Sequence, residues 1–413
     1  MNKFFATILW GLLVIANLSC KKGNKAAADD DTNVPPKKDH YPGLSVSATG
    51  QLLLNGSSYQ GIGVNYFNAF TRTLEDGQYN DQSYKVGFAY LKERKIPFIR
   101  FSLNGYWPKN WNLYLHNKEQ FFKNLDTFVA AAKENNIGLI PSFFWNTPTL
   151  PDLAGEPVNR WGRLNSKTHE LMRTFIRDVV VRYRDATAIW GWEQGNEVNL
   201  LVDLPGDNDN LPPIVPSLGT PSSRSKEDKL YTNDLVVMMG AFAKEIRKYD
   251  GTRIIITGNA IPRPSAWNLS NNGQWTVDTR EQFMSVLGAH DPDSINVLSM
   301  HVYPASASEA YFADGKADID GLLKAAMEAA HRFKKPFFLG EWGAQEALYG
   351  GETPTKFMEI LHAIENNQVP LSAMWVFDYP PHDTEGGINV SPDNGPREYM
   401  LQEIMKVNER ISK

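Results

Sequence analysis

The chain has few features that would link it covalently or attract a nucleic acid. Cys20 is the only cysteine among 413 residues, so no disulfide can form within the chain. The 42 Lys and Arg residues are outnumbered by 47 Asp and Glu, which gives a net charge of −5. Nucleic-acid binding needs a basic surface, so we expect no nucleic-acid partner. With 42% hydrophobic and 22% charged residues, the composition is that of a globular protein with a sizeable core.

Long apolar runs are missing apart from one, residues 4–16, which follows a short cationic start. This run is too short for a comfortable membrane span and is typical of a signal peptide. It leads to Cys20, in a context that resembles a bacterial lipobox, although Leu18 lies one place closer to the cysteine than usual. We therefore predict a signal peptide over residues 1–19, lipidation of Cys20, and a flexible tether over residues 20–43. An ordinary secretory peptide that is cut nearby is the alternative.

These features predict an exported protein that a lipid anchors to a membrane of a Gram-negative-type bacterium. The anchored domain would face the periplasm or lie on the cell surface, and the membrane would be one of its partners. We expect no cofactor and no metal. The polar cluster of His382, Asp383 and Glu385 is interpreted as a solvated loop.

Residues 44–413 alternate short apolar runs with longer amphipathic segments, which predicts βα units around a parallel sheet. Strands are expected at 61–65, 96–101, 137–144, 188–190, 253–257, 295–301, 336–339 and 371–377. Helices are expected at 82–94, 120–135, 166–183, 230–249, 321–333 and 355–366. Eight successive strands favour an α/β fold of the (β/α)8 TIM-barrel type over a doubly wound sheet.

Three segments depart from this alternation. A hairpin is expected over residues 44–59 with its turn at Asn55-Gly56, and it could close the floor of the barrel. Residues 203–228 are rich in Pro, Gly, Asp, Asn and Ser, which predicts a long loop. Another long loop is expected around Trp267 and Trp275. Long loops in compact domains are usually functional or disordered.

Two glutamates lie in short strings that follow predicted strands, Glu197 in WEQGNE after 188–190 and Glu341 in GEWG after 336–339. The carboxyl ends of the strands of a barrel meet at one face, so both side chains are expected there. Retaining glycoside hydrolysis needs two carboxyl groups about 5–5.5 Å apart, one protonated and one ionised. The sequence therefore predicts a glycosidase.

The order of polar and aromatic residues at the predicted strand ends resembles glycoside hydrolase family 5. The matching residues are Arg100 on the second strand, Asn196 and Glu197 on the fourth, His301 and Tyr303 on the sixth, Glu341 on the seventh and Trp375 on the eighth. The resemblance implies a retaining barrel enzyme without a cofactor, with Glu197 as acid/base and Glu341 as nucleophile.

The resemblance also implies roles for the other matching residues. Arg100 would keep Glu341 ionised, and Tyr303 would donate a hydrogen bond to it. The resemblance further implies that Asn196 binds the sugar 2-hydroxyl, that His301 hydrogen-bonds near the acid/base or the sugar, and that Trp375 forms the floor under the sugar ring. Glu193, two residues from Gly195 along its strand, is expected to be structural.

The end of the third strand departs from the family pattern. Many members have a histidine there, whereas this chain continues through Trp145 and Asn146. Either Asn146 takes over the sugar contact or the subsite differs. Trp145 and four other tryptophans are expected near the catalytic face, where they would form a stacking platform for a polysaccharide. The four are Trp107, Trp111, Trp161 and Trp342.

These residues lead to one functional hypothesis and two alternatives. The hypothesis is a retaining β-glycoside hydrolase with a polysaccharide or oligosaccharide substrate, endo-acting on a β-1,4-linked mannan or glucan. The first alternative is an exo-acting β-glycosidase on oligosaccharides, and the shape of loop 203–228 would decide between an open cleft and a closed pocket. The second alternative is a non-catalytic, glycan-binding surface lipoprotein.

Overall fold

The computed structural model describes Lys38 and residues 40–75, 77–306 and 308–411. The predicted signal peptide, the lipidation site Cys20 and most of the predicted tether lie outside the described residues. None of the helices in this part of the chain combines the length and the apolar character that crossing a bilayer requires.

Eight parallel strands form the centre of the described domain. They are β4 (Gly61–Asn65), β5 (Phe98–Ser102), β6 (Gly138–Phe144), β7 (Gly191–Gly195), β8 (Ile254–Ile256), β9 (Leu298–Val302), β12 (Phe337–Trp342) and β13 (Leu371–Met374). Their order in the sheet is β8-β7-β6-β5-β4-β13-β12-β9. Every residue of these strands is buried, as expected of a parallel sheet that is covered on both faces.

The strands β8 and β9 stand at the two ends of this order and close the barrel with contacts of their flanking residues. The Ile255 amide donates to Oδ1 of Asn296, just before β9, at 2.7 Å. Beyond β8, the Ile261 amide donates to the carbonyl of His301 at 3.2 Å. The result is a nearly closed (β/α)8 barrel, which confirms the predicted fold class.

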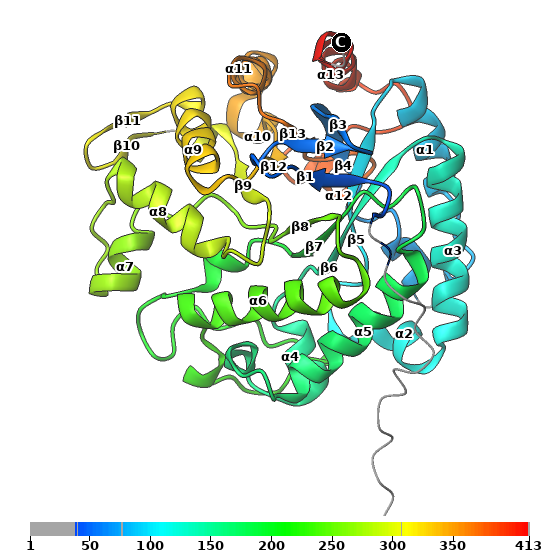
Figure 1. Cartoon of the computed structure of the whole chain (residues 1–413), viewed down its shortest axis with the longest axis vertical. Coiled ribbons are helices and arrows are strands. Elements are labelled where there is room, and N and C mark those ends of the chain that lie inside the picture. The colour runs from blue at the N-terminus through cyan, green and yellow to red at the C-terminus, as the bar shows by residue number, and fades with distance from the viewer. Residues whose placement is uncertain (1–37, 39, 76, 307, 412–413) are drawn as a thin grey trace, which may run out of the picture. The chain divides into compact units, whose positions relative to one another are not determined.

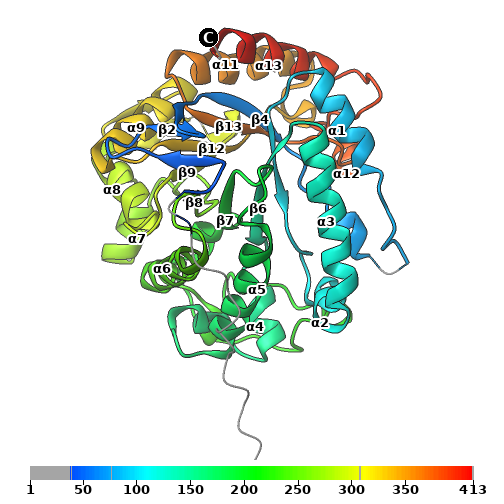
Figure 2. The same cartoon turned by 45° about the vertical axis from the view of Figure 1, so that its right-hand side comes forward.

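One long helix follows each barrel strand and packs outside the strands. These helices are α1 (Tyr84–Glu93), α3 (Lys118–Glu134), α5 (Lys167–Tyr183), α6 (Thr232–Tyr249), α8 (Arg280–His290), α9 (Ile319–Phe333), α11 (Thr353–Asn366) and α13 (Glu398–Ile411). Figure 1 shows α1 and α3 on the right, α5 and α6 below, α8 and α9 on the left, and α11 and α13 above. In Figure 2 the helix α3 stands at the right of the strands β6 and β7.

The ends of two helices are fixed by side-chain hydrogen bonds. Ser166, the expected N-cap of α5, accepts a hydrogen bond from the His169 amide at 3.2 Å. Helix α13 was not predicted, and its Asn408 binds the first barrel strand. The Asn408 amide group accepts from the Ile62 amide and donates to the Ile62 carbonyl, both at 2.9 Å. One side chain thus holds the last helix against β4.

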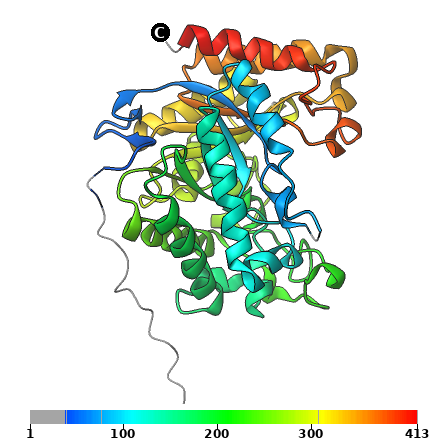
Figure 3. The same cartoon turned by 90° about the vertical axis from the view of Figure 1, so that its right-hand side faces the viewer.

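The expected hairpin covers one end of the barrel. It consists of β1 (Leu44–Val46), β2 (Leu52–Leu54) and β3 (Ser57–Ser58), drawn in blue at the left in Figure 3. Asn55 and Gly56 both have positive φ, at 51° and 89°, as a two-residue hairpin turn requires. Leu44 and Leu52 pack into the apolar cluster at the barrel's centre with Phe98, Ile140, Ile254, Ile256 and Phe338. The predicted floor is therefore present.

The expectation of a long loop around Trp267 and Trp275 was wrong. Much of this segment is helical, as α7 (Ala266–Asn272) and α8. The N-cap of α8 is Thr279, which forms a capping box with Gln282. That Thr-x-x-Gln spacing is a readable signal for a helix start, whereas α7 is short and too polar to show periodicity. A small hairpin, β10 (Ser308–Phe312) and β11 (Gly315–Ala317), also lies outside the predicted elements.

The predicted loop 203–228 is irregular except for two short 3-10 turns, Pro216–Leu218 and Lys226–Asp228. A buried ion pair holds it to α4 (Thr149–Ala154). Both amino groups of the Arg224 guanidinium donate to the Asp152 carboxylate, at 2.6 and 2.8 Å, and both side chains are 2% exposed. The loop is thus fixed to the segment that follows the third barrel strand.

Candidate active site

A buried arginine lies at the centre of the carboxyl-end face of the barrel. Nε of Arg100, on β5, donates to both carboxylate oxygens of Glu193, at 2.8 and 2.9 Å. Its Nη1 donates to Oε1 of Glu341 at 2.7 Å and to Oδ1 of Asn65 at 2.9 Å. Its Nη2 donates to Oδ1 of Asn196 at 2.8 Å. One guanidinium therefore orients four polar side chains from β4, β7, the end of β7 and β12.

The charges of Arg100 and Glu193 influence each other's pKa. Burial opposes the charge of Arg100, but the carboxylates of Glu193 and Glu341 hold its pKa above the usual value. Burial raises the pKa of Glu193, and Arg100 opposes that rise. Glu193 is completely buried, in agreement with the structural role expected for it.

Asn65 belongs to this network although the sequence did not single it out as a site residue. It ends β4, and its Nδ2 donates to the carbonyls of Gly340 at 2.9 Å and Ala373 at 3.0 Å. It therefore connects Arg100 to β12 and β13. A polar residue at the end of an otherwise apolar strand is the feature of the sequence that could have identified Asn65 as a site residue.

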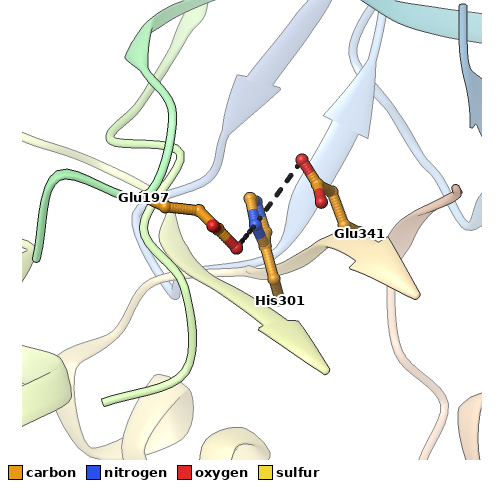
Figure 4. Close-up of side chains that lie close together, drawn as sticks. All are labelled: Glu197, His301 and Glu341. Atoms are coloured by element: carbon orange, nitrogen blue, oxygen red, sulfur yellow. Dashed lines mark hydrogen bonds and ion pairs between the residues drawn. The ribbon is translucent and has the colours of Figure 1, made fainter. Parts of the chain in front are cut away.

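Glu197, His301 and Glu341 meet beside this network, and Figure 4 shows the imidazole between the two carboxylates. Nδ1 of His301 lies 3.0 Å from Oε1 of Glu197 and 3.6 Å from Oε1 of Glu341. One oxygen of each carboxylate and one nitrogen of the imidazole all lie within 4.8 Å of one another. The two glutamates predicted from opposite sides of the barrel are thus brought together.

The backbone around Glu197 is held in an uncommon conformation. Glu197 has φ of +53°, and its amide donates to the carbonyl of Gly258 at 2.8 Å. Gly258 also has positive φ, and a Cβ atom there would lie 1.9 Å from the Gly195 carbonyl oxygen. A glycine is therefore needed after β8 so that the end of β7 can turn Glu197 toward the site.

The protonation behaviour of these groups differs because their surroundings differ. Partial burial raises the pKa of Glu197, and Arg100 opposes the rise. Burial lowers the pKa of His301 to about 3, so the imidazole is neutral near pH 7. The hydroxyl of Tyr303 donates to Oε2 of Glu341 at 2.8 Å, and burial of this hydroxyl raises the pKa of Tyr303 well above its usual value. Glu341 therefore accepts from a cation at one oxygen and from a phenol at the other.

The trio of Glu197, His301 and Glu341 also has the donor types that a divalent metal prefers. Arg100 already lies 2.7 Å from Glu341 and is completely buried. A metal held by the same carboxylate would face this guanidinium at short range, so the charge arrangement favours a metal-free site.

Aromatic side chains line the neighbouring part of the face. The rings of Trp145 and Trp375 are stacked at 6.2 Å, and Phe67 contacts both, at 5.1 and 5.7 Å. The Arg100 guanidinium lies 4.6 Å from the Trp145 ring centre, a cation–π distance. Phe67 was not predicted as a site residue. Asn146 donates to the carbonyl of Tyr106, in the segment after β5, at 3.1 Å and to Oγ1 of Thr149, at the start of α4, at 3.0 Å, so its amide nitrogen is engaged within the protein.

The expected platform of five tryptophans was wrong for three of them. Trp111, Trp161 and Trp342 are 0–1% exposed and pack in the core. Tryptophans near strand ends also fill the space between strands and helices. Position in the sequence does not distinguish a tryptophan that lines the site from one that packs in the core. Trp107 remains partly exposed, and Trp145 is 7% exposed.

Comparison with known proteins agrees with this architecture. The family model described as Cellulase (glycosyl hydrolase family 5) matches residues 55–378. A probable mannan endo-1,4-beta-mannosidase A of Aspergillus flavus is 25% identical over 198 residues, which are 41% of this chain and 48% of that protein. A probable mannan endo-1,4-beta-mannosidase F of the same species is 29% identical over 141 residues, 29% of this chain and 30% of that protein. The chain therefore spans about half or less of these relatives.

Two solved structures show the same fold. An endo-1,4-beta-mannanase from Rhizomucor miehei superimposes with a TM-score of 0.63 and 16% identity, over 90% of this chain and 99% of that one. An endoglucanase from Pseudomonas stutzeri gives a TM-score of 0.52 and 17% identity, over 89% and 97%.

The buried ion-pair network predicts a large loss of stability when its cation is removed. Replacing Arg100 by Leu leaves Glu193 buried without its cation, and we expect the free energy of unfolding to fall by about 3–5 kcal/mol. Denaturant unfolding measures this. The control is Arg182→Leu, which removes a similar two-pronged pair with Asp126 whose side chains are 46% and 44% exposed, and it should cost at most about 1 kcal/mol. Equal losses in the two variants would contradict the central role of Arg100.

Proposed function

The chain belongs to glycosyl hydrolase family 5, and from this premise we propose that it is a retaining β-glycoside hydrolase that is endo-acting on a β-1,4-linked mannan or glucan. The observation that carries the proposal is the proximity of Glu197 and Glu341, which have carboxylate oxygens within 4.8 Å of each other. Retaining enzymes hold their two carboxyl groups about 5–5.5 Å apart, whereas inverting enzymes need about 6.5–9.5 Å to admit a water molecule.

In the proposed first step, an oxygen of Glu341 attacks the anomeric carbon while Glu197 gives its proton to the glycosidic oxygen. The bond to the leaving sugar breaks, and a glycosyl ester of Glu341 forms. The raised pKa of Glu197 suits this donor role. Because the acid form is the active one, proton donation is retained below this raised pKa and lost as the pH rises through it.

In the second step, Glu197 takes a proton from water, and the resulting hydroxyl oxygen attacks the anomeric carbon and releases Glu341. Arg100 and Tyr303 donate to the two oxygens of Glu341 and so fix the orientation of the nucleophile. Neutral His301 touches both carboxylates without adding a charge between them.

The surrounding residues support binding of a β-linked sugar. Asn196 accepts from Arg100 through Oδ1, so its amide nitrogen is the group available to donate to the sugar 2-hydroxyl. Half-buried Trp375 offers an indole face beside Trp145, where the apolar face of a sugar ring can stack. The amide nitrogen of Asn146 is engaged by Tyr106 and Thr149, which favours a different subsite at the end of the third strand.

The names of the relatives favour mannan over glucan, because both fungal proteins are described as mannan endo-1,4-beta-mannosidases. An exo-acting β-glycosidase on oligosaccharides is the alternative. For exo action, loop 203–228, which Arg224 holds to Asp152, would have to make the site a closed pocket instead of an open cleft. A non-catalytic glycan-binding lipoprotein is disfavoured because both carboxylates are present and adjacent.

The substrate can be tested with purified β-1,4-mannan and β-1,4-glucan and chromatography of the products over time. We expect oligosaccharides of several lengths from the first minutes, with mannan cleaved faster. Release of monosaccharide alone from the start would favour the exo-acting alternative. A folded protein that cleaves neither polymer would contradict the proposal.

The roles of the two glutamates predict different failures when each is changed to Ala. Glu197→Ala should lower kcat on polysaccharide by about 10²–10⁴-fold, because the proton donor is lost. An aryl glycoside with an acidic phenol needs little protonation, so its first step should survive and the glycosyl-enzyme should accumulate. Added azide should then rescue turnover and give a β-azide product. Glu341→Ala should form no glycosyl-enzyme with any leaving group.

Kinetics of both variants with and without azide measure these outcomes, with Glu119→Ala, on the exposed start of α3, as the control that should keep full activity. Rescue of Glu341→Ala to a β-azide, with Glu197→Ala rescued only to an α-azide, would show that the two roles are exchanged.

We also propose that the mature protein is lipidated at Cys20 and anchored to a bacterial membrane, facing the periplasm or the cell surface. The support is the apolar run over residues 4–16 that leads to the cysteine. Expressed in a Gram-negative host, the protein should fractionate with membranes and show a lipidated Cys20 by mass spectrometry, and Cys20→Ala should abolish both. A wild-type mature protein cut elsewhere and free in the soluble fraction would contradict this.

A further inference from the structure

The polar cluster of His382, Asp383 and Glu385, interpreted from the sequence as a solvated loop, lies on and just after α12. This element is a single turn, Pro381–Thr384, in the segment that follows β13. The Asp383 and Glu385 side chains are 42% and 72% exposed, as expected of a solvated loop. His382 differs, because its side chain is only 23% exposed and contacts the aromatic residues of the active-site face.

The imidazole of His382 binds the edge of the Trp375 indole. Nε1 of Trp375 donates to Nδ1 of His382 at 3.2 Å, and the two ring centres lie 5.7 Å apart. An indole N–H can only donate, so Nδ1 must be unprotonated and the proton of the neutral imidazole is on Nε2. Nε2 lies 4.0 Å from the Glu385 carboxylate, which suits a donor at that nitrogen. The hydrogen bond to Trp375 therefore exists only while His382 is neutral.

The position of His382 is fixed by contacts that do not involve Trp375. The His382 amide donates to the carbonyl of Tyr379 at 3.0 Å, and the two side-chain rings pack edge to face at 4.7 Å. The Arg397 guanidinium holds the same turn from outside by donating to the Asp383 carboxylate at 3.0 Å. The turn thus presents the imidazole to the indole independently of the bond between them.

The other contacts of the Trp375 indole are made by ring packing. It stacks on Trp145 at 6.2 Å and lies 5.7 Å from Phe67. Aromatic pairs tolerate a range of offsets and tilts, whereas a hydrogen bond weakens steeply when its angle changes. The bond to His382 is therefore the contact that fixes the angle of the half-buried indole face on which a sugar ring is proposed to stack.

Two titratable groups face the imidazole, the Glu385 carboxylate and the Tyr379 ring with its hydroxyl. Burial raises the pKa of Tyr379, so this hydroxyl stays neutral. The other charges at this turn, Asp383 and Arg397, pair with each other at 3.0 Å. Burial lowers the pKa of His382, and Glu385 opposes this effect. The imidazole is therefore neutral near pH 7 and takes up a proton in acid.

We propose that His382 is a positioning residue for Trp375, which sets the angle of the sugar-binding indole while it is neutral and releases the indole when it is protonated. The inference rests on the proposed glycosidase function and adds to it a residue outside the reacting groups. A proton on Nδ1 would face the N–H of Trp375, so that two donors meet and the hydrogen bond is lost. Sugar binding is then retained above the pKa of His382 and weakens as the pH falls through it.

The first test observes the hydrogen bond in protein that carries isotope-labelled tryptophan. The indole N–H resonance of Trp375, identified by its absence in Trp375→Phe, should shift with the charge of His382 in a pH titration. In His382→Asn the amide oxygen replaces Nδ1 as acceptor and cannot be protonated in this range, so the resonance should not titrate. The control His331→Asn, exposed on α9, should titrate like the wild type. This measurement requires no glycosidase activity.

The second test measures kcat/KM on a β-1,4-manno-oligosaccharide as a function of pH. At pH 7, His382→Ala should lower kcat/KM by about three- to tenfold, as for the loss of one neutral hydrogen bond, and His382→Asn should recover most of that loss. On the acid side, His382→Asn should keep activity to lower pH than the wild type, because its acceptor does not titrate. His331→Asn should follow the wild-type profile.

Two results would overturn the inference and leave the proposed function standing. One is a Trp375 resonance that does not titrate in the active wild-type protein. The other is an equal loss of kcat/KM in His382→Ala and His382→Asn with the wild-type pH profile, which would show that the histidine only fills space. A wild-type protein that cleaves no β-linked substrate, although the resonance titrates, would overturn the proposed function and with it the role of His382 in sugar binding.

Discussion

The arrangement of the site depends on one buried cation, Arg100. Its guanidinium donates to Glu193, Glu341, Asn65 and Asn196, four side chains from separate parts of the barrel. A charge taken out of water is costly unless it is paired and hydrogen-bonded, and here the cost is offset by two carboxylates and two amide oxygens. Because all four side chains accept hydrogen bonds from the same planar guanidinium, displacement of one side chain would disturb the others.

The same barrel gives its two glutamates different surroundings. Glu341 accepts from Arg100 and Tyr303, whereas Glu197 makes its side-chain contact with a neutral histidine and has a raised pKa. Burial that raises the pKa of a carboxyl group is a usual way for a protein to keep a proton on an ordinarily ionised residue type. The difference arises from position in the fold, since Glu197 lies just beyond β7 whereas Glu341 lies within the last residues of β12.

The aromatic part of the face packs against the buried arginine. Trp145 stacks on Trp375 and covers Arg100, so it shields the guanidinium at the end of the third barrel strand. Phe67 fills the space between these rings.

The sequence by itself determined the barrel and the order of its site residues, because apolar periodicity and strand ends are local properties. It placed Glu197 and Glu341 on strands four and seven, and parallel strands bring such ends to one face. Only the tertiary structure decided that Asn65 belongs to the Arg100 network, that three tryptophans are core, and that the His382 imidazole meets the Trp375 indole. These features depend on contacts between residues far apart in the chain. No local sequence pattern encodes which side chain packs in the core and which one lines a pocket.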